Sequence, residues 1–141
     1  MKCPYGTVKE QDTTADIAVQ IKAKSLSNLF SAAGWAYTNL VADISKIKPD
    51  VNQTVCCQSD DLTMLMVDWL AELIFIFETK QLLFSKFDTI VKNSCLQTHM
   101  AGQKSGLKPD EYRMDIKAVT WHGLEITNKQ GLYQTRIIFD V

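Results

Sequence analysis

The chain has 141 residues, 46% of them hydrophobic and 22% charged, a composition that favours one globular domain over residues 1–141. Fifteen basic and sixteen acidic side chains give a net charge of −1, so direct tight binding of RNA is disfavoured. The first residues lack the apolar core of a signal peptide, and apolar runs such as LIFIF are too short to cross a bilayer. We therefore expect a cytoplasmic protein with no membrane contact.

The first half of the chain alternates between strand and helix patterns. Residues 15–24 alternate apolar and polar side chains, which is typical of a half-buried strand. Ser25 offers an N-cap, and apolar residues then recur at helical spacing as far as Val41. After a connection at residues 43–50, residues 51–57 alternate again and predict a second short strand.

The second half begins with a helix and continues with β-like sequence. Ser59 is the expected start of this helix, with Asp60 and Asp61 near its positive end. Candidate strands follow at residues 83–92, 95–104, 113–126 and 132–141, with a hairpin turn at residues 128–131. The order predicts an α+β fold in which two amphipathic helices pack on a mainly antiparallel sheet.

The cysteines and aromatic residues carry no clear functional pattern. Four cysteines without a C-x-x-C pair or zinc-ligand spacing predict free thiols: Cys3, Cys56, Cys57 and Cys95. Six aromatic residues at helix or strand spacing predict core packing rather than a base-stacking platform: Trp35, Trp69, Phe75, Phe77, Phe84 and Phe87.

Five residues are candidates for a functional site. Asp16 lies on the polar side of a regular alternation, and Asp140 interrupts the apolar run RIIFDV. The two are either solvated acids or oxygen ligands for calcium or magnesium, together with Val141. Lys117 is either a solvated lysine or a contact for a phosphate or a partner carboxylate. His122 is either a structural histidine or a group that carries protons near neutral pH.

Four segments resemble the archease family in their sequence, their order along the chain and their spacing: TTADIAVQIKA, DWLAELIFIFETKQLLFSKF, DIKAVTWHGLEI and RIIFDV. They cover most of the chain, and the family is similar in fold to the α+β layout above. The first segment departs from the family pattern, because Thr13 stands where the family usually has a histidine. Asp16 remains in register with the family pattern, so the metal assignment is kept.

The resemblance implies a partner of the RNA-splicing ligase in tRNA splicing and RNA repair. The family member helps the ligase to acquire its guanylate and to turn over repeatedly, meets RNA only through the ligase and is not itself an enzyme. The resemblance also implies a divalent cation, usually calcium, held by Asp16, Asp140 and Val141, and a functional role for Lys117.

Two other functions stay open from the sequence. One is a chaperone or modulator of another RNA-modifying enzyme, such as a tRNA methyltransferase. The other is a small metal-dependent phosphate-processing enzyme that uses the same acids with Lys117 and His122. The sequence contains no P-loop, G-x-S-x-G or H-E-x-x-H motif, so an enzyme would lack a familiar catalytic setting.

Overall fold

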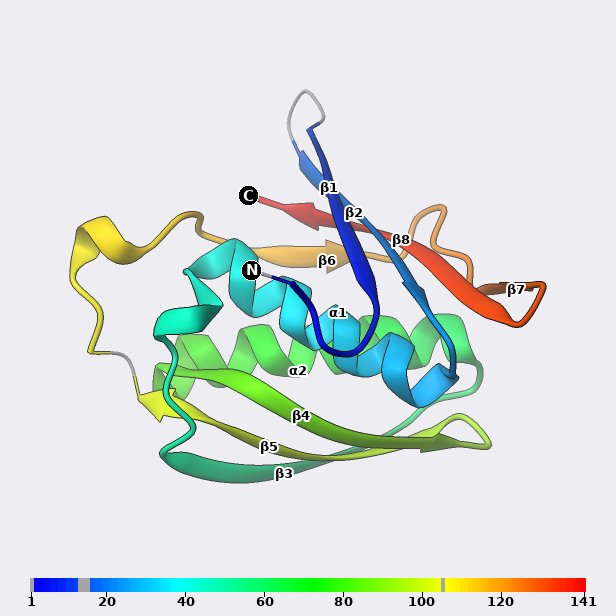
Figure 1. Cartoon of the computed structure of the whole chain (residues 1–141), viewed down its shortest axis with the longest axis horizontal. Coiled ribbons are helices and arrows are strands. Elements are labelled where there is room, and N and C mark those ends of the chain that lie inside the picture. Colours follow the sequence, from blue (N-terminus) through cyan, green and yellow to red (C-terminus); the bar gives the residue numbers. More distant parts are fainter. Residues whose placement is uncertain (1, 13–15, 105) are drawn as a thin grey trace.

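Two antiparallel sheets enclose two helices in the computed structural model, which describes residues 2–12, 16–104 and 106–141 (Figure 1). The elements in chain order are β1 (Thr7–Asp12), β2 (Asp16–Ala23), α1 (Leu26–Val41), η1 (Ile44–Lys46), β3 (Val51–Gln58), α2 (Leu62–Lys80), β4 (Leu82–Lys92), β5 (Cys95–Lys104), η2 (Pro109–Glu111), β6 (Ala118–Thr120), β7 (Thr127–Lys129) and β8 (Leu132–Asp140). The α+β prediction is confirmed.

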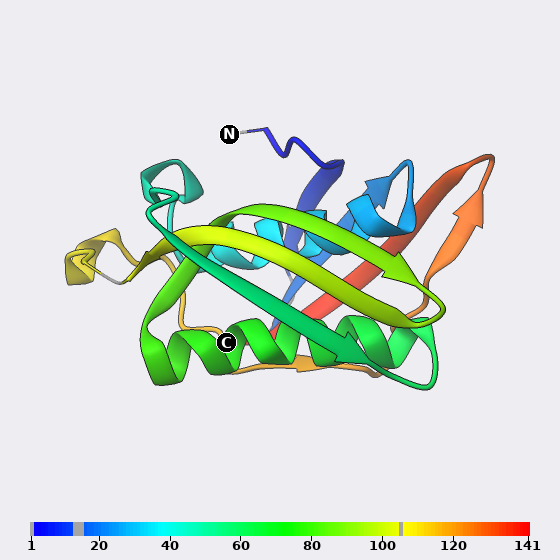
Figure 2. The same ribbon diagram turned by 90° about the horizontal axis from the view of Figure 1, so that it is seen from below.

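The first sheet joins the two ends of the chain. Its strand order is β1-β2-β8-β6, and β7 also pairs with β8. The pairing of β2 with β8 runs without a break from Asp16 opposite Asp140 to Ala23 opposite Tyr133. The second sheet has the order β3-β5-β4 and lies on the other side of the helices, as Figures 1 and 2 show.

Helix α1 begins as the sequence predicts and connects both sheets. The Ser25 hydroxyl accepts a hydrogen bond from the Asn28 N–H at 3.1 Å, so the predicted cap is confirmed. The Ser31 hydroxyl donates to Thr89 of β4 at 2.8 Å, and the Thr38 hydroxyl donates to the Phe84 carbonyl at 2.7 Å. These buried bonds hold α1 against β4, because an unpaired hydroxyl in the core would be costly.

Helix α2 begins later than the sequence predicts. Asp61 is its N-cap, with its carboxylate accepting from the Met64 N–H at 2.8 Å. The expected start at Ser59 is therefore wrong, because the Ser59 hydroxyl instead donates to the Asp68 carboxylate at 2.6 Å. The helix ends at Lys80, and its C-cap Gln81 has a left-handed backbone (φ 59°) that turns the chain into β4.

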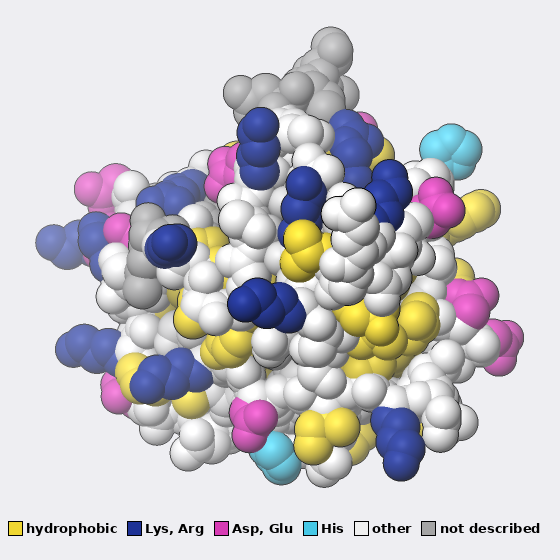
Figure 3. All heavy atoms as spheres, turned by 45° about the vertical axis from the view of Figure 1, so that its right-hand side comes forward, with side chains coloured by type: hydrophobic (Ala, Val, Ile, Leu, Met, Phe, Trp, Pro, Cys, Tyr) yellow, Lys and Arg dark blue, Asp and Glu magenta, His cyan; other side chains and the backbone are white. Residues whose placement is uncertain are grey.

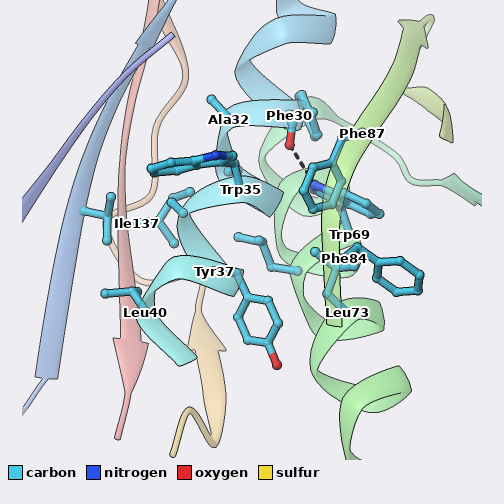
Figure 4. Close-up of a cluster of buried hydrophobic side chains, with 14 of the residues drawn as sticks. Phe30, Ala32, Trp35, Tyr37, Leu40, Trp69, Leu73, Phe84, Phe87 and Ile137 are labelled. Atoms are coloured by element: carbon cyan, nitrogen blue, oxygen red, sulfur yellow. Dashed lines mark hydrogen bonds between the residues drawn. The ribbon is translucent and has the colours of Figure 1, made fainter. Parts of the chain in front are cut away.

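The core lies between the two sheets and is rich in aromatic side chains. Trp69 is fully buried and its indole N–H donates to the Phe30 carbonyl at 2.9 Å (Figure 4). The ring of Phe87 meets Trp69 edge-on, with centroids 6.1 Å apart. Trp35, Phe84 and Phe87 are also buried, as predicted. Phe75 contradicts its prediction, because 57% of it is exposed on the solvent side of α2.

The remaining sequence predictions concern the other strands, the hairpin turn and the cysteines. Strand β1 was not expected, and residues 113–126 form only the three-residue β6 between irregular segments. The hairpin turn is confirmed, with Gln130 and Gly131 at positive φ between β7 and β8. All four cysteines are free thiols. Within the described ranges, no helix is both long and apolar enough to cross a bilayer.

Replacing Trp69 with alanine should lower the free energy of unfolding by roughly 3–5 kcal/mol, because the substitution empties a fully buried site. Phe75→Ala on the same helix is the matched control, and its effect should stay within about 0.5 kcal/mol. Urea denaturation followed by circular dichroism measures both. Equal losses in the two variants would contradict the arrangement of α2.

Replacing Gly102 with alanine should also destabilise the protein, by roughly 1–3 kcal/mol. A Cβ atom at this position would overlap the Leu83 carbonyl oxygen and lie 2.6 Å from the Phe84 Cα, beside the irregular pairing of β4 and β5. Gly106→Ala is the control, because its Cβ would have no neighbour closer than 4.0 Å. Thermal melts of the two variants should separate clearly, and a Gly102 variant as stable as the control would refute the close approach.

Candidate functional site

The two candidate acids lie directly opposite each other at one end of the first sheet. Asp16 is the first residue of β2, Asp140 is the last residue of β8, and the two are register partners. Opposite residues of an antiparallel pair project their side chains from the same face, with Cβ atoms about 5 Å apart. The structure thus brings together two carboxylates that are far apart in the sequence.

Lys117 and Val141 adjoin this pair. The Lys117 N–H donates to the Asp140 carbonyl at 2.9 Å, which fixes the lysine backbone beside the last strand. Ala118 follows and is the partner of Asp140 on the β6 side. Val141 continues directly from Asp140 and is 45% exposed. Four of the five candidate residues are therefore gathered at one end of the sheet.

His122 lies away from this end. Its N–H donates to the Thr120 hydroxyl at 3.2 Å, and its ring contacts the exposed Trp121. Thr120 pairs with Ile138, so the chain from Ala118 to His122 runs away from Asp140 along β8. The loop after β6 sits toward the β7 side of the sheet, as Figure 1 shows. The structure does not bring His122 to the two acids.

Ala118 is a residue of the site that sequence reasoning missed. It faces Asp140 from β6 in the row that also contains Asp16 on β2. Because side chains of one such row share a face, the methyl group of alanine leaves the space above Asp140 open on that side. Its only signal in the sequence is a small residue directly after Lys117.

The rest of this sheet face is basic. Lys9 of β1, Gln20 of β2 and Arg136 of β8 form one row across the strands, and Lys22 lies in the next row. The Arg136 guanidinium donates to the Gln11 side chain at 3.0 Å across β2. Figure 3 shows Lys and Arg side chains grouped in the upper part of one face of the molecule. Asp16 and Asp140 thus form an acidic end to a cationic face.

The donor set suits a hard divalent cation. Two carboxylates directly opposite each other repel unless a positive charge lies between them, and calcium and magnesium take oxygen ligands from carboxylates and main-chain carbonyls. Asp140 is exposed and Asp16 is half-buried, so a cation could reach both. Within residues 2–12, 16–104 and 106–141, no cluster of three or more His, Cys, Asp or Glu side chains could hold a metal. Main-chain or water oxygens would have to complete the site.

One expected feature of the site falls outside the described residues. Thr13, which stands at the position of the family histidine, lies in the segment 13–15 that the structure does not describe.

Comparisons with known proteins identify the family of this chain. The model of the archease protein family matches residues 9–141. The archease of Methanosarcina barkeri is 33% identical over 135 residues, which is 92% of either chain. The archease of Methanothermobacter thermautotrophicus is 33% identical over 133 residues, covering 92% of this chain and 95% of its own.

Two solved structures share the fold. A solution structure of a Methanobacterium thermoautotrophicum protein has a TM-score of 0.80 and 32% identity, covering 97% of this chain and 99% of its own. A Thermotoga maritima crystal structure, described as an archease and possible chaperone, has a TM-score of 0.64 and covers 94% of this chain and 96% of its own. At 20% identity it supports the fold alone. From the family match over almost its whole length, this chain belongs to the archease protein family.

Proposed function

We propose that this protein is a non-catalytic activator of an RNA-splicing ligase, and that a divalent cation, most simply calcium, organises its docking end. The family match over residues 9–141 supports this function, and the facing carboxylates of Asp16 and Asp140 are the observation that carries the metal site. The proposed place of action is the cytoplasm, where the ligase would supply the RNA contact.

The residues at this end have separate roles in the proposal. Asp16 and Asp140 hold the cation through their carboxylates, and Val141 adds a main-chain oxygen. The cation screens the repulsion of the two acids and fixes the ends of β2 and β8 relative to each other. Lys117, whose backbone N–H is bonded to the Asp140 carbonyl, is exposed and presents an ammonium group to a phosphate or a carboxylate of the ligase.

Activation in this proposal is a shift of a conformational equilibrium of the ligase. A docking protein that binds the guanylate-accepting state more tightly than the other states raises the population of that state. It needs no nucleophile of its own. The accessible acids and the exposed lysine at one end of a sheet suit such a docking role, whereas the separation of His122 from the acids offers no acid–base pair for catalysis there.

Calcium should raise the melting temperature of the protein, because a ligand of the folded state stabilises it by mass action, by about 2.7 kcal/mol at a hundredfold excess over Kd. Asp140→Asn should abolish the calcium effect. Without metal, the same variant should be as stable as the parent protein or slightly more stable, because one of two opposed charges is removed.

Asp110→Asn, at an exposed acid of η2, is the matched control for the calcium experiment and should keep the full shift. Melts are recorded in chelator and in calcium, with magnesium as a second ion. If calcium still raised the melting temperature of Asp140→Asn, the cation would bind somewhere other than at Asp16 and Asp140.

The activator role is tested with the RNA ligase of the same organism, by measuring guanylylation and RNA joining at substoichiometric amounts of this protein. The parent protein should increase both. Lys117→Ala should weaken activation at least tenfold, equivalent to about 1.4 kcal/mol of docking free energy, and Lys117→Arg should restore part of it. Lys80→Ala, at the exposed end of α2, is the control.

Two results would favour the other functions over activation. Unchanged guanylylation with the parent protein, together with specific recovery of a tRNA methyltransferase in pull-downs, would favour the modulator role. Hydrolysis of nucleotides or cyclic phosphates by the pure protein, lost in Asp16→Ala, would favour the enzyme.

A further inference from the structure

The edge of the second sheet formed by β3 differs from the other sheet edges in the described part of the chain. A free strand edge exposes unpaired N–H and C=O groups that can pair with another strand, and proteins usually block such edges with charges, short strands or covering groups. Strand β1 carries the charged residues Lys9 and Glu10. Strand β6 is only three residues long. The first sheet is therefore blocked at both sides.

The β4 edge of the second sheet is covered by side chains. The Phe87 N–H donates to the Tyr5 hydroxyl at 2.8 Å, and the Val91 N–H donates to the Ser27 hydroxyl at 3.0 Å. A register shift between Phe84 and Lys86 also interrupts the regular edge. These features leave β4 poorly suited to take another strand.

Strand β3, at the opposite edge, has none of these protections. Its eight residues, VNQTVCCQ, contain no charge and no proline, and all of them pair with β5 in unbroken register. Among the residues that the structure describes, none outside β5 forms a backbone hydrogen bond with this strand. Figure 2 shows β3 on the outside of the sheet, crossing in front of α2.

The register identifies the main-chain groups that point outward. The Ser59 N–H donates to the Ser94 carbonyl at 3.2 Å, in continuation of the β3–β5 register. Hydrogen-bonded residues alternate along an antiparallel pair, so Cys57, Val55 and Gln53 bond to β5. The N–H and C=O groups of the residues that alternate with them point to the free edge: Asn52, Thr54, Cys56 and Gln58.

The surroundings of this edge are acidic on the helix side. Burial, and then the nearby carboxylates of Glu72 and Asp68, raise the pKa of the Cys57 thiol to about 11. Asp68 is exposed, and Asp60 and Asp61 are exposed just after the strand ends. A second copy of this chain would bring its own acids to the same place, whereas a strand with Lys or Arg side chains on its helix-facing side would neutralise them.

We propose that β3 is a docking edge for an extended segment of a partner protein that carries Lys or Arg at alternate positions. The segment adds a fourth strand to the second sheet through the main-chain groups of Asn52, Thr54, Cys56 and Gln58. Its basic side chains face Glu72 and Asp68. This edge is distinct from the end of the first sheet that holds Asp16 and Asp140, and the proposal does not depend on the activator role.

The probe is a short synthetic peptide in which Lys alternates with Thr or Val, and the readout is amide hydrogen exchange of the full-length protein. Exchange at Asn52, Thr54, Cys56 and Gln58 should slow at least tenfold at saturating peptide, while the amides already bonded to β5 keep their rates. The same peptide with Glu in place of Lys should bind at least tenfold more weakly.

Two pairs of variants test the contacts on either side of the edge. Cys56→Lys should weaken binding of the basic peptide, whereas Cys56→Ser should not, and both are at an exposed position that tolerates change. Glu72→Gln should weaken binding, whereas Glu78→Gln on the same helix should not.

Three outcomes would overturn the proposal. The first is unchanged exchange at the outward amides in the presence of the Lys peptide. The second is equal binding of the Lys and Glu peptides. The third is protection of the same amides without peptide at high protein concentration, with a dimer in sedimentation, because the occupant would then be a second copy.

Discussion

The antiparallel pairing of β2 with β8 is the constraint on which the candidate site depends. Val19 and Ile21 of β2, and Ile137 and Phe139 of β8, are buried against the helices. A slip of the pairing by one residue would turn one strand's apolar side chains toward solvent and its polar ones toward the core. The hydrophobic core therefore fixes the register, and the register in turn places Asp16 opposite Asp140. The free energy that holds the two acids together comes from burial elsewhere on the same strands.

The helices separate two sheets with different surfaces. Helix α1 contacts β2 of the first sheet, and through Ser31 and Thr38 it bonds to β4 of the second. The first sheet presents a cationic face that ends in two acids, and the second sheet presents an uncharged free edge at β3. A single core thus supports two surfaces that differ in charge.

Local patterns in the sequence predicted the elements that depend on local physics. The Ser25 cap, the alternation of β2 and the turn at residues 128–131 follow from side chains close to each other in the chain. The cap at Asp61 was missed because three adjacent residues, Ser59, Asp60 and Asp61, are all good N-caps. Strand β1 was missed because this mostly polar edge strand, TVKEQD, has no buried apolar pattern. The residues alone could not predict that Asp16 and Asp140 lie opposite each other, because this is a long-range contact that only the family resemblance indicated.

The contact between Tyr5 and Phe87 determines where a reporter group can be attached. The Tyr5 hydroxyl accepts a hydrogen bond from the Phe87 N–H, and the Tyr5 ring contacts the Phe87 ring. The Phe87 ring in turn contacts Trp69 and lies close to Gly34, where a Cβ atom would overlap it. An affinity tag that pulls residues 2–6 from their place would unsettle this aromatic cluster, and one fused after Val141 would crowd Asp140. The turn at Gln130 and Gly131 lies at the far end of β8 from Asp140 and is exposed. A fluorophore or short epitope inserted there leaves both regions undisturbed.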